Sequence, residues 1–282
     1  MKAFQHQRGL SMIELLIALA ISSFLILGIT QIYIDNKRNH VFQQSQAGNL
    51  ESSRFATLMV NEYLSKSGYR RNPASLLEFV FPSQNASGDC LAFSAGHSIT
   101  GLDPNVGTGF CIRYQPLTSG ELDCQSVASE AFDDTKAFSN DPDTSLIVLA
   151  FKYAPSNDDA LHDGSLQCKS LNAPTPQYVE LLRGIADLRL DFGVGNTDVL
   201  EKEVSGFISQ ADWTPADGAI RSVRYAMLMS SRVGQRDGED SKVLDDWLTG
   251  ASDTDKERLE EADNRRIYQV ASSTQTIRNL MP

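Results

Sequence analysis

The sequence of 282 residues lacks the short motifs that mark common catalytic sites. It contains no G-x-S-x-G elbow, no H-E-x-x-H pair and no Gly-rich phosphate loop before a helix. Histidine is scarce, and the chain has only His6, His40, His97 and His162. His97 and His162 lie in polar loop contexts, so we expect both to be exposed to solvent. These absences argue against a hydrolase, and we predict that the protein is not an enzyme and has no catalytic residue.

Basic residues are scarce in most of the chain. Residues 72–282 contain 17 lysines and arginines against 32 aspartates and glutamates. Such an excess of negative charge repels DNA, so direct nucleic-acid binding is not expected. Only residues 35–71 have a positive excess over any length, with six basic and three acidic residues.

Charged residues are almost absent from Leu10 to Ile34, where Glu14 is the only one in 25 residues. No proline interrupts this run. A helix of that length extends about 37 Å, which is enough to cross a bilayer. Lys2 and Arg8 precede the run and favour a cytoplasmic N-terminus, so the acidic part of the chain is expected outside the cytoplasm.

Three interpretations fit this N-terminus. A secretory signal requires a small-residue cleavage site after the apolar core, and "FLILGITQIY" offers no clear one. A plain signal anchor fits the length but leaves Glu14 unexplained, because a carboxylate in the membrane costs ~2.5 to 3.5 kcal/mol on insertion scales. In the third interpretation, a protease cuts before the run, after Gly9, and removes the basic leader on the cytoplasmic side.

The letters "RG" followed by "LSMIELLIAL" resemble the class III signal of type IV prepilins and of the related pseudopilins of type II secretion. The shared features are the short basic leader, Gly9, a hydrophobic first mature residue (Leu10) and a glutamate at the fifth mature position (Glu14). The resemblance implies that a prepilin peptidase cuts between Gly9 and Leu10 and that Leu10 is then N-methylated. Cleavage would free an amine on Leu10, so we interpret Glu14 as an assembly residue that pairs with the amine of its own chain or, in a bundle, with that of a neighbouring subunit.

Two departures and the later sequence indicate which kind of pilin the chain resembles. Major pilins mostly begin with phenylalanine and many have a proline about twenty residues on, and this chain has neither feature, which favours a minor component. The blocks "HDGSLQCKS", "LLRGIADLRLDFGVG", "IRSVRYAMLMSSR" and "NRRIYQVASSTQTIRNL" resemble successive parts of the PilW family of minor pilins. That family is similar in turn to the J-type minor pseudopilin.

The expected fold class is α+β, with a long N-terminal helix packed on an antiparallel β-sheet head. We predict a leader at residues 1–9, a transmembrane helix at 10–34, an amphipathic second half of the helix at 35–72 and a periplasmic β-rich head at 73–282. Phe55, Met59 and Tyr63, with Leu58 beside them, form a stripe that is expected to pack on the head. Gly68 is the expected C-cap.

Segments after residue 75 have strand character. The expected strands are "LLEFVF", "CLAFSA", "GFCIRYQP", "SLIVLAFKY", "ADLRLDFGV", "SVRYAMLMS" and "IYQVASSTQTI". In "ADLRLDFGV" apolar residues alternate with Asp187, Arg189, Asp191 and Gly193, which predicts one wet face. "EDSKVLDDWLTG" is consistent with a short helix, and "SDTDKERLEEADNRR" with a charged helix or loop.

The four cysteines, Cys90, Cys111, Cys124 and Cys168, form no C-x-x-C pair, which argues against a zinc knuckle or a thioredoxin-type redox site. An even number of cysteines outside the cytoplasm favours two disulfides over four buried thiols. Four cysteines allow three connectivities. Cys90 and Cys111 lie in adjacent strand-like segments, so we interpret the pairing as sequential, with the other two closing a loop.

Acidic clusters are the only candidate metal ligands. They are Asp133, Asp134, Asp141 and Asp143 in one stretch and Asp237, Glu239 and Asp240 in another. Calcium takes such oxygen ligands, but neither stretch has the EF-hand spacing and acidic loops are usually just solvated. We therefore predict no cofactor and no metal ligand, with calcium as the alternative.

The resemblance implies a structural function. We expect a minor pilin of the inner membrane that primes a type IV pilus or joins its tip complex, supporting twitching motility and adhesion. Its partners would be other minor pilins, a tip adhesin, the prepilin peptidase and the assembly platform. The alternatives are a minor pseudopilin of a type II secretion system and a bitopic membrane-anchored enzyme or binding module.

Overall fold

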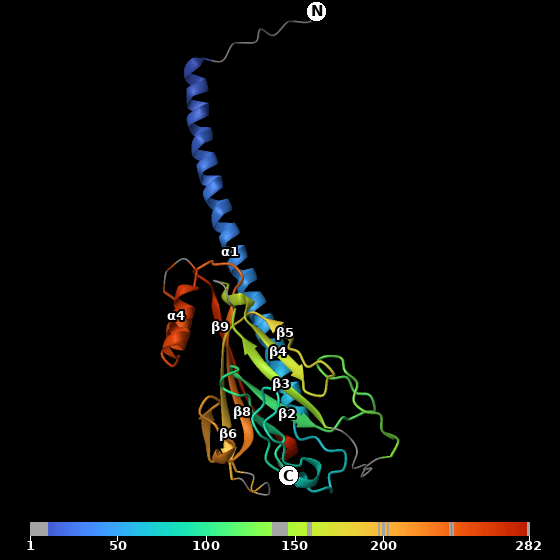
Figure 1. The fold of residues 1–282 in the computed structure, drawn as a ribbon. Coiled ribbons are helices and arrows are strands. Elements are labelled where there is room, and N and C mark those ends of the chain that lie inside the picture. Colours follow the sequence, from blue (N-terminus) through green and yellow to red (C-terminus); the bar gives the residue numbers. More distant parts are fainter. Residues whose placement is uncertain are drawn as a thin grey trace, which may run out of the picture. The chain divides into compact units, whose positions relative to one another are not determined.

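The computed structural model describes residues 11–136, 146–156, 160–196, 203–236 and 240–280, together with Asp198, Glu201 and Gly238. The chain forms two compact units, Met1–Ser45 and Gln46–Pro282. The second unit is called the head. Figure 1 shows the elements along the chain.

Helix α1 (Met12–Lys66) is continuous over 55 residues. It ends at Lys66, before the predicted bound at 72, because Gly68, the expected C-cap, follows with a φ of +73°. A left-handed residue after the last turn is the usual way to stop a helix, and glycine adopts that conformation without a Cβ clash. The Gly68 N–H then donates to the carbonyl of Arg113 at 3.1 Å, which ties the end of the helix to the head.

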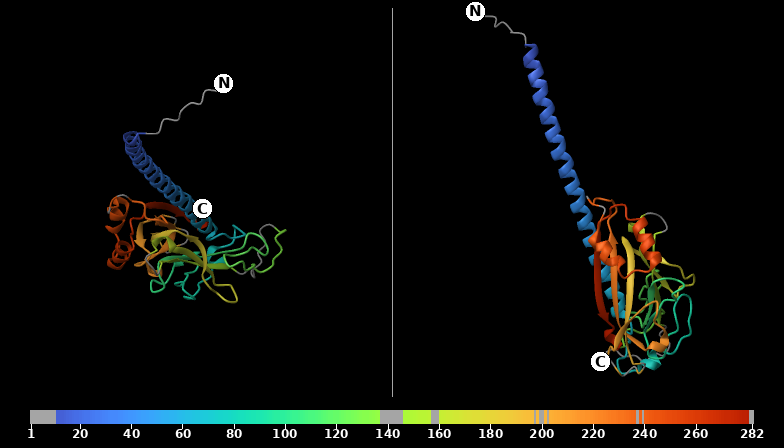
Figure 2. Two further views of the ribbon diagram at one scale, coloured as in Figure 1. Left: turned by 90° about the horizontal axis from the view of Figure 1, so that it is seen from above. Right: turned by 90° about the vertical axis from the view of Figure 1, so that its left-hand side faces the viewer.

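The head contains two antiparallel sheets rather than the single sheet that was expected. The first has the order β1-β2-β3-β4-β5 and contains β1 (Ile99–Gly101), β2 (Gly109–Tyr114), β3 (Ile147–Ala154), β4 (Ser165–Ser170) and β5 (Val179–Arg183). The second has the order β7-β6-β8-β9 and contains β6 (Ile185–Gly195), β7 (Gly206–Ser209), β8 (Ala219–Ser230) and β9 (Tyr268–Thr276). In Figure 2 the orange and red strands of the second sheet run side by side along the head. The expected α+β class, a long helix packed against antiparallel sheets, is confirmed.

Short helices complete the head. They are α2 (Leu77–Val80), α3 (Lys242–Leu248) and α4 (Asp253–Glu261), with 3-10 turns η1 (Leu161–Asp163), η2 (Pro215–Asp217) and η3 (Arg278–Leu280). Serine side chains cap both longer helices: Ser241 Oγ accepts from the Leu244 N–H at 3.4 Å, and Ser252 Oγ accepts from the Asp255 N–H at 3.2 Å.

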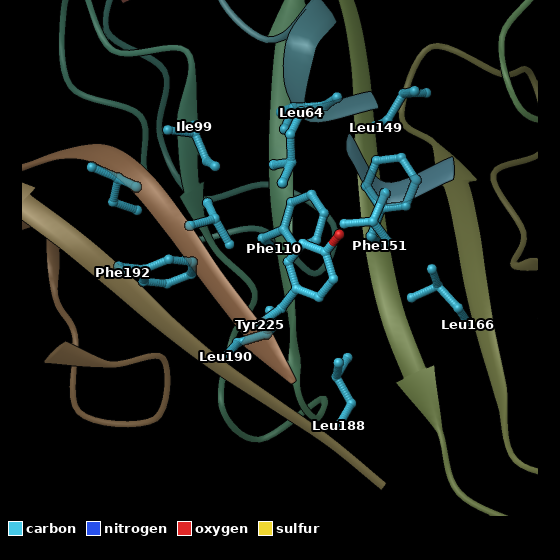
Figure 3. Packing of buried hydrophobic residues seen from close by; sticks show 14 of the residues in the cluster. Leu64, Ile99, Phe110, Leu149, Phe151, Leu166, Leu188, Leu190, Phe192 and Tyr225 are labelled. Carbon is cyan, nitrogen blue, oxygen red and sulfur yellow. The ribbon is translucent and has the colours of Figure 1, made fainter. Parts of the chain in front are cut away.

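The main core lies where the head part of α1 meets strands of both sheets (Figure 3). Its aromatic residues make edge and stacking contacts, with ring centroids 5.0 Å apart for Phe110 and Phe151 and 5.5 Å apart for Phe192 and Trp213. Leu64 of α1 is fully buried in this cluster. Burial of apolar surface stabilises a fold by about 25 cal/mol per Å². It is the main force that holds the sheets and the helix together.

Several local predictions are wrong, and the reason is tertiary packing. "LLEFVF" contains helix α2 rather than a strand, and Phe79 remains 69% exposed. "CLAFSA" forms isolated bridges only. His97 is buried, because its loop folds over the Arg113 side chain. The expected wet face of β6 is partly covered, since Asp187 lies under α3 and α4 and bonds to Trp247 and Arg258.

Candidate functional site

The apolar part of α1 presents its side chains outward. Every described residue up to His40 is exposed, including large side chains such as Leu16 and Phe24. This part of the helix is long and apolar enough to cross a membrane. Its hydroxyl groups bond to the helix itself, since Ser22, Ser23 and Thr30 donate to carbonyls three or four residues back at 2.7 to 2.8 Å. Polar groups that are paired in this way carry a reduced cost in hydrocarbon.

Glu14 lies in the first turn of α1, three residues after Ser11. Its Oε2 accepts a hydrogen bond from the Ser11 N–H at 3.4 Å. This contact is one half of a capping box, in which a glutamate in the first turn binds the otherwise unpaired N–H that precedes the helix. The S-x-x-E signal was present in the sequence and was missed. Gly9 and Leu10, the predicted cleavage positions, lie outside the described residues.

A stripe on the head part of α1 packs against the rest of the head. Its buried residues are Asn49, Ser53, Ala56, Val60 and Leu64, spaced three to four apart. The Asn49 amide donates to the Ile267 carbonyl at 3.0 Å, which fixes the helix beside β9. The small side chains of Ser53 and Ala56 allow the helix to approach the sheets closely.

The predicted stripe of Phe55, Met59 and Tyr63 is therefore partly wrong. Tyr63 packs against the core, with its ring centroid 4.8 Å from that of Phe151. Phe55 is 52% exposed and Leu58 is 69% exposed. The helical period alone does not tell which apolar stripe the head covers, and the smaller residues one position away fit better. Two large apolar side chains consequently remain on the free side of this helix.

The head is cross-linked by two disulfides. Cys90 pairs with Cys111 of β2, and Cys124 pairs with Cys168 of β4. This is the sequential pairing that was interpreted from the sequence. Each bridge connects a loop to the first sheet, and such links stabilise mainly by restricting the unfolded chain, typically by about 2–4 kcal/mol.

Arg113 is fully buried in β2 without a carboxylate partner among the described residues. Its guanidinium lies 4.6 Å from the ring centroid of Phe93. It donates to four backbone carbonyls at 2.6 to 3.2 Å, those of Phe81, Pro82, Ser94 and His97. Burial lowers the pKa of Arg113 to about 10, so the side chain stays charged at neutral pH. The arginine thus organises the loop that contains α2 and Cys90.

Asp89, next to Cys90, is the carboxylate of a second polar cluster. It accepts hydrogen bonds from the Lys169 ammonium at 2.5 Å and from the Tyr178 hydroxyl at 2.7 Å. Burial alone would raise the pKa of Asp89, but these two hydrogen bonds outweigh it and the pKa is lowered. The cluster connects the Asp89 loop to β4 and is structural in character.

The acidic clusters do not assemble into a metal centre in the part of the chain that the structure describes. Asp133 lies 3.1 Å from Lys136, and Asp134 accepts from the Ser119 N–H at 3.1 Å. Asp141, Asp143, Asp237 and Glu239 lie outside the described residues. The calcium alternative therefore has no support from the residues that are described.

Comparison with protein families assigns both halves of this arrangement. Residues 4–30 match the prokaryotic N-terminal methylation motif. Residues 153–279 match the family described as type IV pilus-assembly protein W, or PilW, and they include all four strands of the second sheet. The chain thus combines a region that matches the PilW family of type IV pilus assembly proteins with the prokaryotic N-terminal methylation motif. Both matches agree with the predicted family and support a pilin-like structural protein.

The chain was also compared with curated proteins and with solved structures. None of the curated proteins compared with the chain gives a match. Among solved structures, a type IV-like pilin from Thermus thermophilus aligns over 84% of this chain and 98% of its own, with 12% identity and a TM-score of 0.39. The family match and the methylation motif imply that this chain works with the pilus assembly machinery.

Proposed function

We propose that this protein is a minor pilin that primes the type IV pilus and takes part in its tip complex. The observation that carries the proposal is the methylation motif in front of a PilW head on one chain. The chain would enter the inner membrane through residues 10–34, with residues 73–282 in the periplasm. The prepilin peptidase would remove residues 1–9, and the shortened subunit would join other minor pilins and a tip adhesin on the assembly platform. Pili that start in this way would support twitching motility and adhesion.

Helix packing supplies the mechanism. The large apolar side chains from Met12 to Ile34 are exposed, and so are Phe55 and Leu58 on the head part of α1. As subunits leave the membrane, these surfaces would be buried against the helices of neighbouring subunits. Burying a leucine or phenylalanine side chain contributes about 1.5–3 kcal/mol, so a few such contacts per subunit are sufficient for a stable bundle.

Glu14 would specify the register of that bundle. A buried ion pair adds little net stability because desolvation offsets the attraction, but it disfavours arrangements that leave the carboxylate unpaired. The partner proposed for it in the bundle is the amine of Leu10 on a neighbouring subunit, which cleavage produces. This role requires the charge of Glu14 and not merely its length.

Mass spectrometry of the mature N-terminus tests the processing step. We expect the chain purified from membranes to begin with an N-methylated Leu10 and to lack Met1–Gly9. Gly9→Val should leave the leader uncut, because a side chain at that position obstructs the protease. An intact leader on the wild-type chain would overturn the proposal.

Assembly is tested separately in a strain that lacks the gene. Glu14→Leu should insert into the membrane at a normal level but restore few pili, whereas Glu14→Asp should restore more because it keeps the charge. Surface pili and twitching are the readouts, and secretion of exoproteins is measured in parallel. Rescue of secretion instead of piliation would contradict a pilus function, and normal piliation by Glu14→Leu would contradict the register role.

A further inference from the structure

One cleft of about 670 Å³ opens in the head beside β6. Its walls come from the turn before β2, the end of β3, the end of β7 and the segment between α3 and α4. Five consecutive residues of β6, from Asp187 to Asp191, line it. A run of consecutive strand residues in one cleft indicates that the strand presents its edge there, because side chains of one face would appear only at alternate positions.

The edge of β6 is uncovered at this position. Strand β7 pairs only with residues 191–194 of β6, although β6 begins at Ile185. The Gln210 N–H makes the last hydrogen bond of this ladder, to the Leu190 carbonyl at 2.9 Å, and the chain then turns away. Successive residues direct their backbone groups to alternate edges, so Leu188 faces the same side as Leu190. Among the described residues no hydrogen bond reaches the Leu188 carbonyl on that side, whereas the Leu188 N–H interacts with the carboxylate of Asp187.

Two side chains fix the two ends of the uncovered stretch through hydrogen bonds. At one end the Tyr153 hydroxyl donates to the Ala186 carbonyl at 2.5 Å, connecting β3 to β6. At the other end the buried Gln210 amide donates to the Leu102 carbonyl at 3.1 Å and accepts from the Gly109 N–H at 3.4 Å. These contacts join the two sheets on either side of Leu188. The gap between them is thus fixed by the fold and does not depend on a mobile loop.

Charge gives the cleft a preference. The acidic side chains that line it are already paired: Arg258 lies 3.0 Å from Asp187 and 3.3 Å from Asp255, and Arg224 lies 3.0 Å from Asp191. Arg189 differs. Its guanidinium stacks 4.2 Å from the Trp247 ring centroid and donates to the Trp247 carbonyl, with no carboxylate within salt-bridge distance in the described part of the chain.

We propose that this cleft binds an extended segment of a partner protein, which pairs with β6 at Leu188 in line with β7 and places an acidic side chain against Arg189. Addition of a strand to an open sheet edge supplies affinity through backbone hydrogen bonds and specificity through alternate side chains. Carboxylate–guanidinium contacts are among the stronger hydrogen bonds, which makes the acidic residue the main determinant of sequence. This site is independent of leader processing and of the apolar surface of α1.

The test uses the full chain in detergent micelles and labelled seven-residue peptides of alternating threonine and valine. One glutamate is moved through all seven positions, and each peptide is matched by its glutamine counterpart. Fluorescence anisotropy should show saturable binding for at least one glutamate position, about tenfold tighter than its glutamine counterpart. The same peptide with alternate backbone nitrogens methylated should not bind, because it cannot donate to the edge of β6.

Variants assign the binding to the cleft. Arg189→Gln should remove the preference for glutamate, and Ala211→Glu, which adds a carboxylate at an exposed lining position, should weaken binding at least tenfold. Arg183→Gln removes one exposed positive charge outside the cleft and should leave binding unchanged. Absence of saturable binding across the whole set, or binding that both cleft variants leave intact, would overturn the proposal.

Discussion

The clearest test of how the head is held together is the replacement of Arg113 by methionine. Methionine fills a similar volume but cannot donate to the four carbonyls that the guanidinium binds. A hydrogen bond to a charged group contributes about 1.5–3 kcal/mol, so the loss of four such bonds amounts to roughly 8 kcal/mol. The loop that carries these carbonyls also contains α2 and leads to Cys90.

The variant also removes a cost. Burial lowers the pKa of Arg113 from its ordinary value to about 10, and this corresponds to about 3 kcal/mol that desolvation of the cation costs the folded state. The hydrogen bonds are the larger effect, so we expect Arg113→Met to lower the free energy of unfolding by about 5 kcal/mol. Arg113→Lys keeps a charge but has only three donors. It should lower the free energy of unfolding by only about 2 kcal/mol.

Urea unfolding of the full chain in detergent micelles, with the disulfides intact, measures these differences. The two tryptophans, Trp213 and Trp247, are both buried in the head and report on its unfolding by fluorescence. Arg183→Met, at an exposed position, is the matched control and should change stability by less than about 0.5 kcal/mol. If the free energy of unfolding of Arg113→Met lies within 1 kcal/mol of the wild-type value, the four carbonyls have found other donors. That result would refute the predicted role of Arg113.

Three further predictions concern the head. Asp89→Asn should lower the free energy of unfolding by about 1 kcal/mol at pH 7. Because the pKa of Asp89 is lowered in the folded state, this difference from the wild type should shrink as the pH falls below about 4. A difference that stays constant down to pH 2 would contradict this prediction. Ala56→Leu should cost about 1–3 kcal/mol in urea unfolding by overpacking the fully buried contact of α1, whereas Leu58→Ala should be nearly neutral in the monomer. Gly109→Ala should reduce the melting temperature, since a Cβ there would lie 2.0 Å from the Phe151 carbonyl oxygen; an unchanged value would show that β2 shifts freely.

Elements with a strong local pattern were predictable from the sequence. The end of α1 followed from Gly68, and helix α3 followed from the apolar and charged spacing of "EDSKVLDDWLTG". Strands β3, β6, β8 and β9 followed from short apolar or alternating runs. In these segments local propensity and tertiary packing favour the same structure, so the local sequence pattern is enough to predict the element.

What failed depended on partners distant in the sequence. "LLEFVF" has strand composition, yet the chain around it must close over the Arg113 guanidinium, and a helical turn places the carbonyl of Phe81 within reach. The wet face of β6 was read correctly as polar, but its Asp187 is buried because Trp247 and Arg258 arrive from α3 and α4. The cleft beside β6 could not be foreseen either, since it exists only because β7 turns away after four residues.

Glu14 has both a structural contact in the helix cap and a proposed role in assembly. Before processing, its carboxylate already has a donor in the Ser11 N–H, so the glutamate is not an unpaired anion in an apolar helix. Cleavage after Gly9 would leave that N–H in place and add a cationic amine one residue away. We therefore infer that processing strengthens a contact that the helix cap has positioned in advance. Ser11→Pro removes the N–H but leaves the predicted amine, so it separates the two contributions: near-normal piliation would assign the role of Glu14 to the amine, and loss of piliation with normal cleavage would assign it to the cap.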